Sequence, residues 1–159
     1  MSAAGNLPDD SGTVSERRNR IVFLVIAVLS AAGMAVSGLS LQRHYAKSAT
    51  SFCELGEKFD CDIVNRSEYS SLMGIPVAGI GIAGYGVLLA LSARCRSRGE
   101  SPMWLFATAA AGLVFALYLT YVEAYVLGTW CVLCLGSLGL IVIITGLAGV
   151  AQVQSRNSS

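Results

Sequence analysis

The sequence predicts an all-α membrane protein, a four-transmembrane-helix bundle with a long extracytoplasmic loop between helices 1 and 2. Of the 159 residues 54% are hydrophobic and 13% are charged, against about 25% charged in soluble domains. Four apolar stretches, which hold one charged residue between them, come close to the roughly 20 residues that cross a bilayer. This composition excludes a water-soluble enzyme and a disordered chain. The net charge of +1 argues against nucleic acid as a partner.

The four predicted spans are residues 21–41, 73–93, 104–127 and 130–150, and Glu123 is the one charged side chain among them. The runs are continuous, whereas a membrane β-barrel shows alternating segments of about ten residues. The first run is longer than the roughly 7–15 apolar residues of a signal peptide, so we expect it to be retained as a signal anchor. Small residues recur along every span, which predicts close helix packing.

The distribution of Lys and Arg predicts the orientation, because cytoplasmic flanks of membrane helices carry the excess of positive charge. One set of flanks carries seven of these residues, and the other set carries four. The first set is Arg17, Arg18, Arg20, Arg94, Arg96, Arg98 and Arg156, and the second is Arg43, Lys47, Lys58 and Arg66. We therefore expect disordered cytoplasmic termini at 1–19 and 152–159, a membrane domain at 20–151, and the loop 42–72 on the opposite, outer side.

Four of the five cysteines fall on this outer side, where thiols form and exchange disulfides. Cys53 and Cys61 lie in the loop 42–72, and Cys131 and Cys134 form C-x-x-C at the start of the fourth span. A helix N-terminus favours a reactive thiolate. We expect Cys131 to be the more exposed and Cys134 to lie nearly one turn deeper. The pattern favours redox exchange, with two structural disulfides or a four-cysteine zinc site as alternatives.

Two further residues need an interpretation. Cys95 lies between Arg94 and Arg96, which predicts a surface thiol or an acylation site on the cytoplasmic side. Glu123 lies in a span, where a carboxyl group costs a few kcal/mol unless it is protonated or paired. It is a candidate to relay protons or to hydrogen-bond a bound molecule. The alternative is an interfacial carboxylate paired with Arg43, Lys47 or a hydroxyl group. The single histidine, His44, excludes a multi-histidine metal site, and we expect no resident metal.

The cysteine pattern resembles the bacterial form of the vitamin K epoxide reductase family. Seven residues separate Cys53 from Cys61, Ser67 follows six positions after Cys61, and the late motif is Cys131-Val132-Leu133-Cys134. The segments 67–70, 74–78, 118–123 and 130–131 are also similar to bacterial members. The resemblance covers about residues 20–150. A separated pair followed by C-x-x-C is the reverse of the order in the other bacterial quinone-linked thiol oxidase family.

The resemblance implies a role for each of these residues. Cys131 and Cys134 would be the active-site pair, with Cys134 reacting with a quinone, either ubiquinone or menaquinone, or a vitamin K-type quinone. Cys53 would exchange with a thioredoxin-like partner, and Cys61 would pass electrons to Cys131. Ser67 would help to hold a quinone oxygen, or would cap a helix, and the two roles are compatible.

Two departures from the animal enzymes decide between reactions. Leu138 stands where those enzymes have a tyrosine in their vitamin K pocket, and the stretch after Ser67 is shorter. We therefore expect quinone reduction coupled to protein disulfide formation, in a bacterial cytoplasmic membrane with the site facing the periplasm. Without a fused thioredoxin-like domain, the thiol oxidant would be a separate protein. The alternatives are a vitamin K quinone or epoxide reductase proper, and a non-enzymatic membrane protein with structural disulfides.

Overall fold

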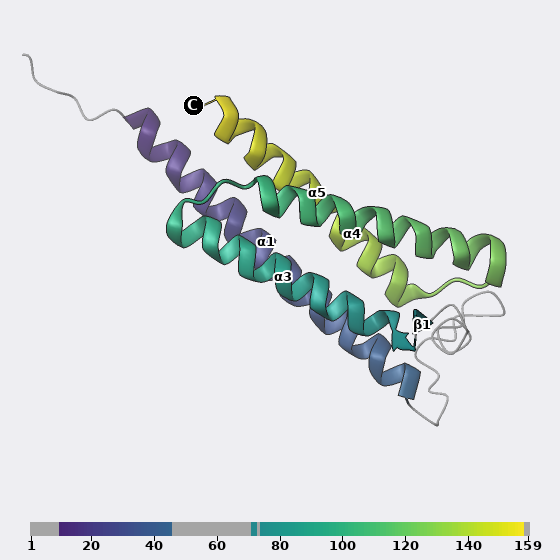
Figure 1. Ribbon diagram of the computed structural model, residues 1–159. Coiled ribbons are helices and arrows are strands. Elements are labelled where there is room, and N and C mark those ends of the chain that lie inside the picture. The colour runs from purple at the N-terminus through teal and green to yellow at the C-terminus, as the bar shows by residue number, and fades with distance from the viewer. Residues whose placement is uncertain (1–9, 46–70, 73, 158–159) are drawn as a thin grey trace, which may run out of the picture.

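The protein is a bundle of four long helices (Figure 1). The computed structural model describes residues 10–45, 71–72 and 74–157. The elements are α1 (Asp10–Tyr45), β1 (Ser71–Leu72), β2 (Ile75–Pro76), α3 (Val77–Arg98), α4 (Met103–Val122), the π-helical turn η2 (Glu123–Leu127) and α5 (Val132–Asn157). Four helical segments in this part of the chain are long and apolar enough to cross a membrane. The predicted four-helix membrane fold is therefore confirmed.

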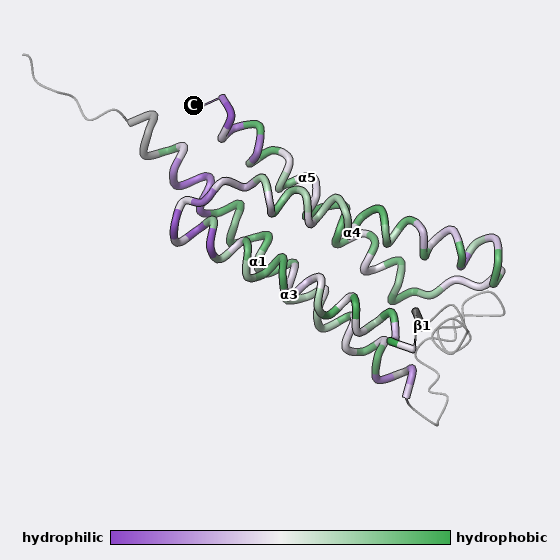
Figure 2. The backbone as a smooth tube through the Cα atoms, in the orientation of Figure 1, coloured by the Kyte–Doolittle hydropathy of each residue, from purple (hydrophilic) through white to green (hydrophobic). Residues whose placement is uncertain are grey.

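Successive helices run in opposite directions, so the bundle has two distinct ends (Figure 1). Helix α1 packs along α3 and α5, and α4 packs along α5. The start of α1, the α3–α4 connection and the end of α5 lie together at what we call the arginine end. The end of α1, the β1–β2 pair and the η2–α5 connection lie at the other end, called the cysteine end after Cys131 and Cys134. Hydropathy follows the same division, with hydrophilic residues gathered at the arginine end (Figure 2).

The outer helices extend beyond the spans that the sequence predicts. Helix α1 begins at Asp10 and α5 continues to Asn157, so the expectation of disorder is wrong for residues 10–19 and 152–157. A helix that has already formed adds one hydrogen bond for each further residue, without a new nucleation step. Exposed ion pairs one turn apart add a little stability, and Arg20 Nε lies 3.8 Å from Glu16 Oε1.

The second span begins at Val77 instead of Met73, because a short antiparallel pair of strands precedes it. Ser71 pairs with Pro76, and Leu72 pairs with Ile75. Gly74 turns the chain between them with φ of 85°, a conformation that favours glycine. Pro76 then precedes the first turn of α3, where helix N–H groups have no intrahelical partner and proline is tolerated.

The packed core fills the half of the bundle nearer the arginine end. Its buried members come from the first half of α1, the middle and second half of α3, the first half of α4 and the middle and second half of α5. They are Phe23, Ile26, Tyr85, Leu88, Cys95, Leu105, Ala109, Ile141, Ile144, Ala148 and Ala151. Thr145 adds a polar contact there, since its hydroxyl donates to the Ala109 carbonyl on α4 at 3.2 Å.

Helices α1 and α3 approach closely at small residues, as the sequence predicts. A Cβ on Gly33 would lie 2.4 to 2.5 Å from atoms of the Tyr85 ring, and a Cβ on Gly81 would lie 2.7 Å from Ser37 Oγ. The buried face of α1 repeats every three or four residues, at 23, 26, 30, 33, 37 and 40. Its second half carries serines and glycine in place of large apolar residues, which leaves space on the side of the cysteine end.

Candidate active site

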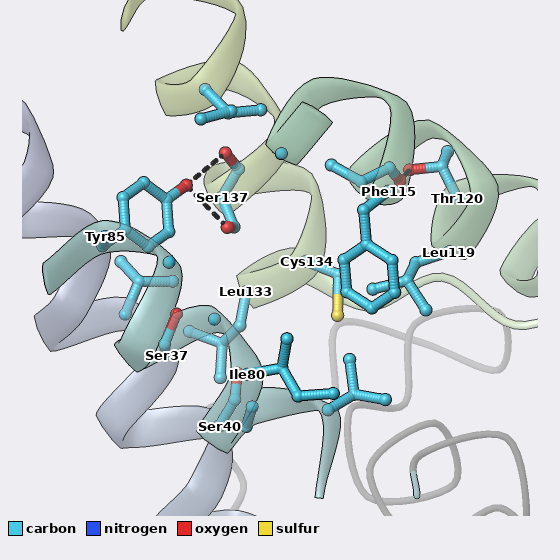
Figure 3. Close-up of a pocket in the computed structure, with 18 of the residues that line it drawn as sticks. Ser37, Ser40, Ile80, Tyr85, Phe115, Leu119, Thr120, Leu133, Cys134 and Ser137 are labelled. Carbon is cyan, nitrogen blue, oxygen red and sulfur yellow. Dashed lines mark hydrogen bonds between the residues drawn. The ribbon is translucent and has the colours of Figure 1, made fainter. Parts of the chain in front are cut away.

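A cavity of about 350 Å³ lies among the four helices, in the half of the bundle nearer the cysteine end (Figure 3). Its wall is mostly apolar. The lining residues that carry polar groups are Ser37, Ser40, His44, Tyr85, Thr108, Thr120, Glu123, Cys134 and Ser137. Tyr85, Leu88 and Ile141 belong both to this lining and to the buried core, so they mark where the cavity ends against the packed half. An apolar hollow with a few polar groups is typical of small-molecule sites.

The π-helical turn η2 positions Glu123 at the end of α4. π-helical turns are rare and occur frequently at functional sites. Glu123 is 2% exposed, and its Oε2 accepts the backbone N–H of Cys131 at 3.2 Å. Gly128, with φ of 63°, ends the turn and reverses the chain. This hydrogen bond ties the carboxyl group to the start of α5. Of the cations weighed as partners, Lys47 and the side chain of Arg43 lie outside the described residues.

The two cysteines of C-x-x-C differ in burial, and their order is the opposite of the one expected. Cys131 is fully buried and contacts Leu127 and Leu133, whereas Cys134 is partly exposed. The chain turns inward at residues 129–131 before α5 begins, which buries Cys131 at the helix start. Cys134 follows on the first turn of α5, and its sulfur points into the cavity (Figure 3). The expectation that Cys131 is the more exposed thiol is therefore wrong.

The three groups form one cluster. A carboxylate oxygen of Glu123 and the Sγ atoms of Cys131 and Cys134 all lie within 4.8 Å of one another, and both cysteines are thiols. The backbone N–H of Cys134 donates to Cys131 Sγ at 3.4 Å, and such a donor stabilises a thiolate. The arrangement can give up two electrons as the dithiol becomes a disulfide, with an acid–base group alongside. The same three donors could hold a metal ion.

A comparison with protein families assigns the chain to a known family. A model of the vitamin K epoxide reductase family matches residues 24–148, which span from the first long helix into the last. The chain belongs to the vitamin K epoxide reductase family. It is therefore a membrane oxidoreductase of a quinone-linked family. This membership confirms the resemblance seen in the sequence.

The cavity fits the quinone that the vitamin K epoxide reductase family uses. Its volume lies at the lower end of the roughly 300–1,000 Å³ found for small-molecule pockets, and Cys134 is the thiol that lines it. Aromatic and aliphatic side chains such as Phe115, Leu119 and Ile80 form much of its wall (Figure 3). A planar, largely apolar ring with two carbonyl oxygens suits this mixture of apolar wall and scattered hydroxyl groups.

Hydroxyl groups in this wall are the part of the site that the sequence reasoning missed. The Tyr85 hydroxyl on α3 donates to the Ser137 carbonyl on α5 at 2.9 Å and lies 2.9 Å from Ser137 Oγ (Figure 3). On α1, Ser37, Ser40 and His44 share one helix face at intervals of three and four residues. That polar stripe within an apolar span was the available signal.

The other candidate residues have different outcomes. Cys53, Cys61 and Ser67 lie outside the residues that the structure describes. Cys95 is 5% exposed and belongs to the core, with its Sγ 4.0 Å from the Ser101 carbonyl, so the prediction of a surface thiol is wrong. Helical spacing explains its burial, since Leu88 and Ser92 precede it on the same buried face of α3.

Proposed function

We propose that the protein is a quinone-dependent thiol–disulfide oxidoreductase. It reduces a quinone and passes the oxidising equivalents through two cysteine pairs to a thioredoxin-like partner, for disulfide bond formation. The observation that carries the proposal is the position of Cys134, whose sulfur points into an apolar cavity while Glu123 and Cys131 lie within 4.8 Å of it.

In the terminal step, Cys131 and Cys134 give up two electrons and two protons and become a disulfide. A bound quinone takes up both and leaves as the quinol. Cys134 is the thiol that meets the ring, because it lines the cavity. Glu123 holds the start of α5 through the Cys131 N–H and offers an acid–base group within reach of both sulfurs. A quinone whose reduction potential lies well above that of the thiol couple makes electron transfer in this direction favourable, by about 1.4 kcal/mol for each 30 mV of difference.

The burial of Cys131 supports a relay through the loop 42–72. A soluble protein has no direct access to a sulfur that is 0% exposed, so a thiol pair carried by the chain itself is the better candidate to exchange with it. In the proposed relay, the reduced partner attacks the Cys53–Cys61 disulfide. The Cys61 thiolate that is released then attacks the Cys131–Cys134 disulfide. Ser67 helps to hold a quinone oxygen.

The arrangement of charge supports a location in a bacterial cytoplasmic membrane, with the site facing the periplasm. The seven arginines named above gather at one end of the bundle, and the C-x-x-C motif lies at the other (Figures 1 and 2). Under the positive-inside rule, the arginine end and both termini face the cytoplasm. The cysteine end then faces the oxidising compartment, where disulfides are made.

We propose ubiquinone or menaquinone as the acceptor in preference to a vitamin K epoxide. Leu138, at the position of the animal tyrosine, is partly buried and packs against the core. It offers no hydroxyl group to protonate an epoxide oxygen. Quinone reduction needs only the dithiol, the cavity and the two protons that the thiols release.

The test is quinone reduction by the purified protein in detergent, with a reduced thioredoxin-like protein or a small dithiol as the donor. We expect turnover by the wild type with both donors and none by Cys134→Ala with either. Cys53→Ala should fail with the protein donor but still turn over with the small dithiol. Cys95→Ser is the matched control, because this thiol lies in the core half and lines no part of the cavity. If no variant reduces quinone and the thiols stay permanently bridged, the cysteines are structural.

A further inference from the structure

We propose that the reduced site is also a binding site for Zn²⁺, with Cys131 Sγ, Cys134 Sγ and a Glu123 carboxylate oxygen as its three protein ligands. The sequence analysis considered zinc only as a site made by four cysteines, and the structure points to a different set of donors. Glu123 is the first residue of η2, Cys131 immediately precedes α5 and Cys134 lies on its first turn, and the three donors lie within 4.8 Å of one another.

The spacing of the donors is close to what a zinc ion requires. With Zn–S bonds of about 2.3 Å and Zn–O bonds of about 2.0–2.2 Å, tetrahedral geometry places ligand atoms roughly 3.5–3.8 Å apart. Inward movement of the side-chain tips by roughly 1 Å closes the site around the ion. Glu123 directly follows α4, Cys131 directly precedes α5 and Cys134 lies on the first turn of α5, so the backbone already holds the three groups close together.

Two hydrogen bonds orient these ligands, as outer-shell partners do in metal sites. The Cys131 N–H holds Glu123 Oε2 at 3.2 Å, which leaves the second carboxylate oxygen to bind a cation. The Cys134 N–H holds Cys131 Sγ at 3.4 Å, which stabilises the thiolate form that ligates metals. The same contacts that prepare the dithiol for exchange therefore also prepare it for coordination.

The chemistry of the donors selects the class of metal. Two thiolates and one carboxylate favour Zn²⁺ and related thiophilic divalent cations over Mg²⁺ and Ca²⁺, which prefer all-oxygen sites. The ion replaces the two thiol protons and changes no oxidation state. Glu123 and Cys134 both line the cavity, so the fourth coordination position faces it. The ion would therefore be exchangeable, as it is in zinc sites with three protein ligands and one open position.

The consequence for the proposed function is reversible inhibition. While Zn²⁺ engages both sulfurs, they cannot form a disulfide, and the ion stands between Cys134 and the cavity. Only this consequence rests on the proposed function, because binding itself is an equilibrium that needs no quinone. A chain that binds Zn²⁺ and reduces no quinone would refute the oxidoreductase proposal and leave the metal site intact.

Metal binding can be measured on the full chain in detergent, after reduction by a phosphine that is then removed. Zn²⁺ affinity comes from competition with a chromophoric chelator, and Co²⁺ reports thiolate coordination by its absorption bands. The wild type, Glu123→Gln, Cys134→Ser and the core control Cys95→Ser are compared. A parallel set carries Cys53→Ser and Cys61→Ser, so that the loop thiols cannot supply ligands.

We expect one Zn²⁺ per reduced chain in both sets, unchanged by Cys95→Ser and lost in Cys134→Ser. Glu123→Gln should bind at least about tenfold more weakly, because loss even of an outer-shell partner costs 10–100-fold in affinity. A trivalent phenylarsenical, which needs only the two sulfurs, should bind wild type and Glu123→Gln alike. This match shows that the dithiol of the variant is intact and accessible, so that weaker Zn²⁺ binding reports the loss of the carboxylate.

Three results would each overturn the site. One is Zn²⁺ binding by Glu123→Gln as tight as by the wild type, which would leave the dithiol as the whole site. Another is loss of binding in the Cys53→Ser/Cys61→Ser background, which would assign the ligands to the loop. The third uses the wild type alone and does not depend on how a variant folds: Zn²⁺ binding that survives oxidation of Cys131 and Cys134 to a disulfide.

Discussion

Glu123 combines two properties at one position, namely an acid–base group and the hydrogen bond that holds the start of α5. The change Glu123→Gln separates them, because the amide oxygen of glutamine can still accept the Cys131 N–H while the acid–base function is lost. We expect quinone turnover to fall roughly 10²-fold or more, which is a common contribution of a positioned acid or base. Steady-state quinone reduction measures it.

The control for this prediction is Glu100→Gln, which neutralises an exposed carboxylate in the α3–α4 connection, at the other end of the bundle. It should retain wild-type turnover. Wild-type turnover by Glu123→Gln itself would reduce the role of the carboxyl group to holding α5 in place.

Tyr85 joins α3 to α5 through its hydroxyl group, at the boundary between core and cavity. The change Tyr85→Phe keeps the ring against Gly33 but removes the contacts with the Ser137 carbonyl and Oγ, both at 2.9 Å. We expect the free energy of unfolding to fall by about 0.5–1.5 kcal/mol, the usual net contribution of a hydrogen bond. Thermal or denaturant unfolding in detergent measures it. Tyr118→Phe, on the exposed surface of α4, should leave stability unchanged, and equal stability of both variants would contradict this role of Tyr85.

The sequence predicted which residues gather at the site better than it predicted the exposure and the contacts of each side chain. The C-x-x-C motif and Glu123 were identified as candidates, and the structure brings them together. The exposure of Cys131 and Cys134 was inverted, because depth along a span does not reveal that residues 129–131 turn inward. Tyr85 and Ser137 were missed, since a contact between residues 52 positions apart depends on the packing of α3 against α5.

At the scale of the elements, the close approach of α1 and α3 depends on glycine. A Cβ at Gly33 would lie 2.4 to 2.5 Å from the Tyr85 ring, whereas a Cβ at Gly38, on the same helix, would meet nothing within 4 Å. We expect Gly33→Ala to destabilise the bundle by about 1–3 kcal/mol, as overpacking does. Gly38→Ala should be neutral or stabilising by up to about 1 kcal/mol, because alanine favours a helix. Unfolding midpoints compare the two variants, and equal midpoints would refute the tight contact.

The presence of four apolar helices was predictable, because it follows from the hydrophobicity of the sequence. The residues at which these helices begin and end were not predictable in the same way. The turn between β1 and β2 lies within a stretch of continuous hydrophobicity, so the start of α3 at Val77 was placed four residues too early. The π-helical turn at Glu123–Leu127 leaves no mark in hydropathy. Cys95 could have been placed correctly, since its spacing from Leu88 and Ser92 is that of one helix face, but the neighbouring arginines outweighed that periodicity.

For the whole molecule, four antiparallel spans place both ends of the described chain on one side (Figure 1), and the proposed side is the cytoplasm. Green fluorescent protein, which fluoresces after folding in the cytoplasm and not after Sec export, should therefore fluoresce when fused at either terminus. Alkaline phosphatase, which needs the periplasm, should be inactive at both. The control is alkaline phosphatase fused after Tyr45, which should be active. Termini on opposite sides would contradict four spans, and two periplasmic termini would reverse the orientation.

The complete burial of Cys131 also bears on which reactions the proposed relay avoids. Other proteins with exposed thiols would otherwise reduce the C-x-x-C disulfide directly, and quinone would be consumed in oxidising proteins that are not the partner. A protein surface does not reach a sulfur that is 0% exposed, so in the proposed relay Cys131 exchanges with a thiol of its own chain and not with a protein thiol from solution. In the proposed relay, the choice of thiol donor is then set by the surface that receives the partner. Greater exposure of the Cys131 side chain would let other protein thiols reduce the disulfide, without lowering the rate of quinone reduction.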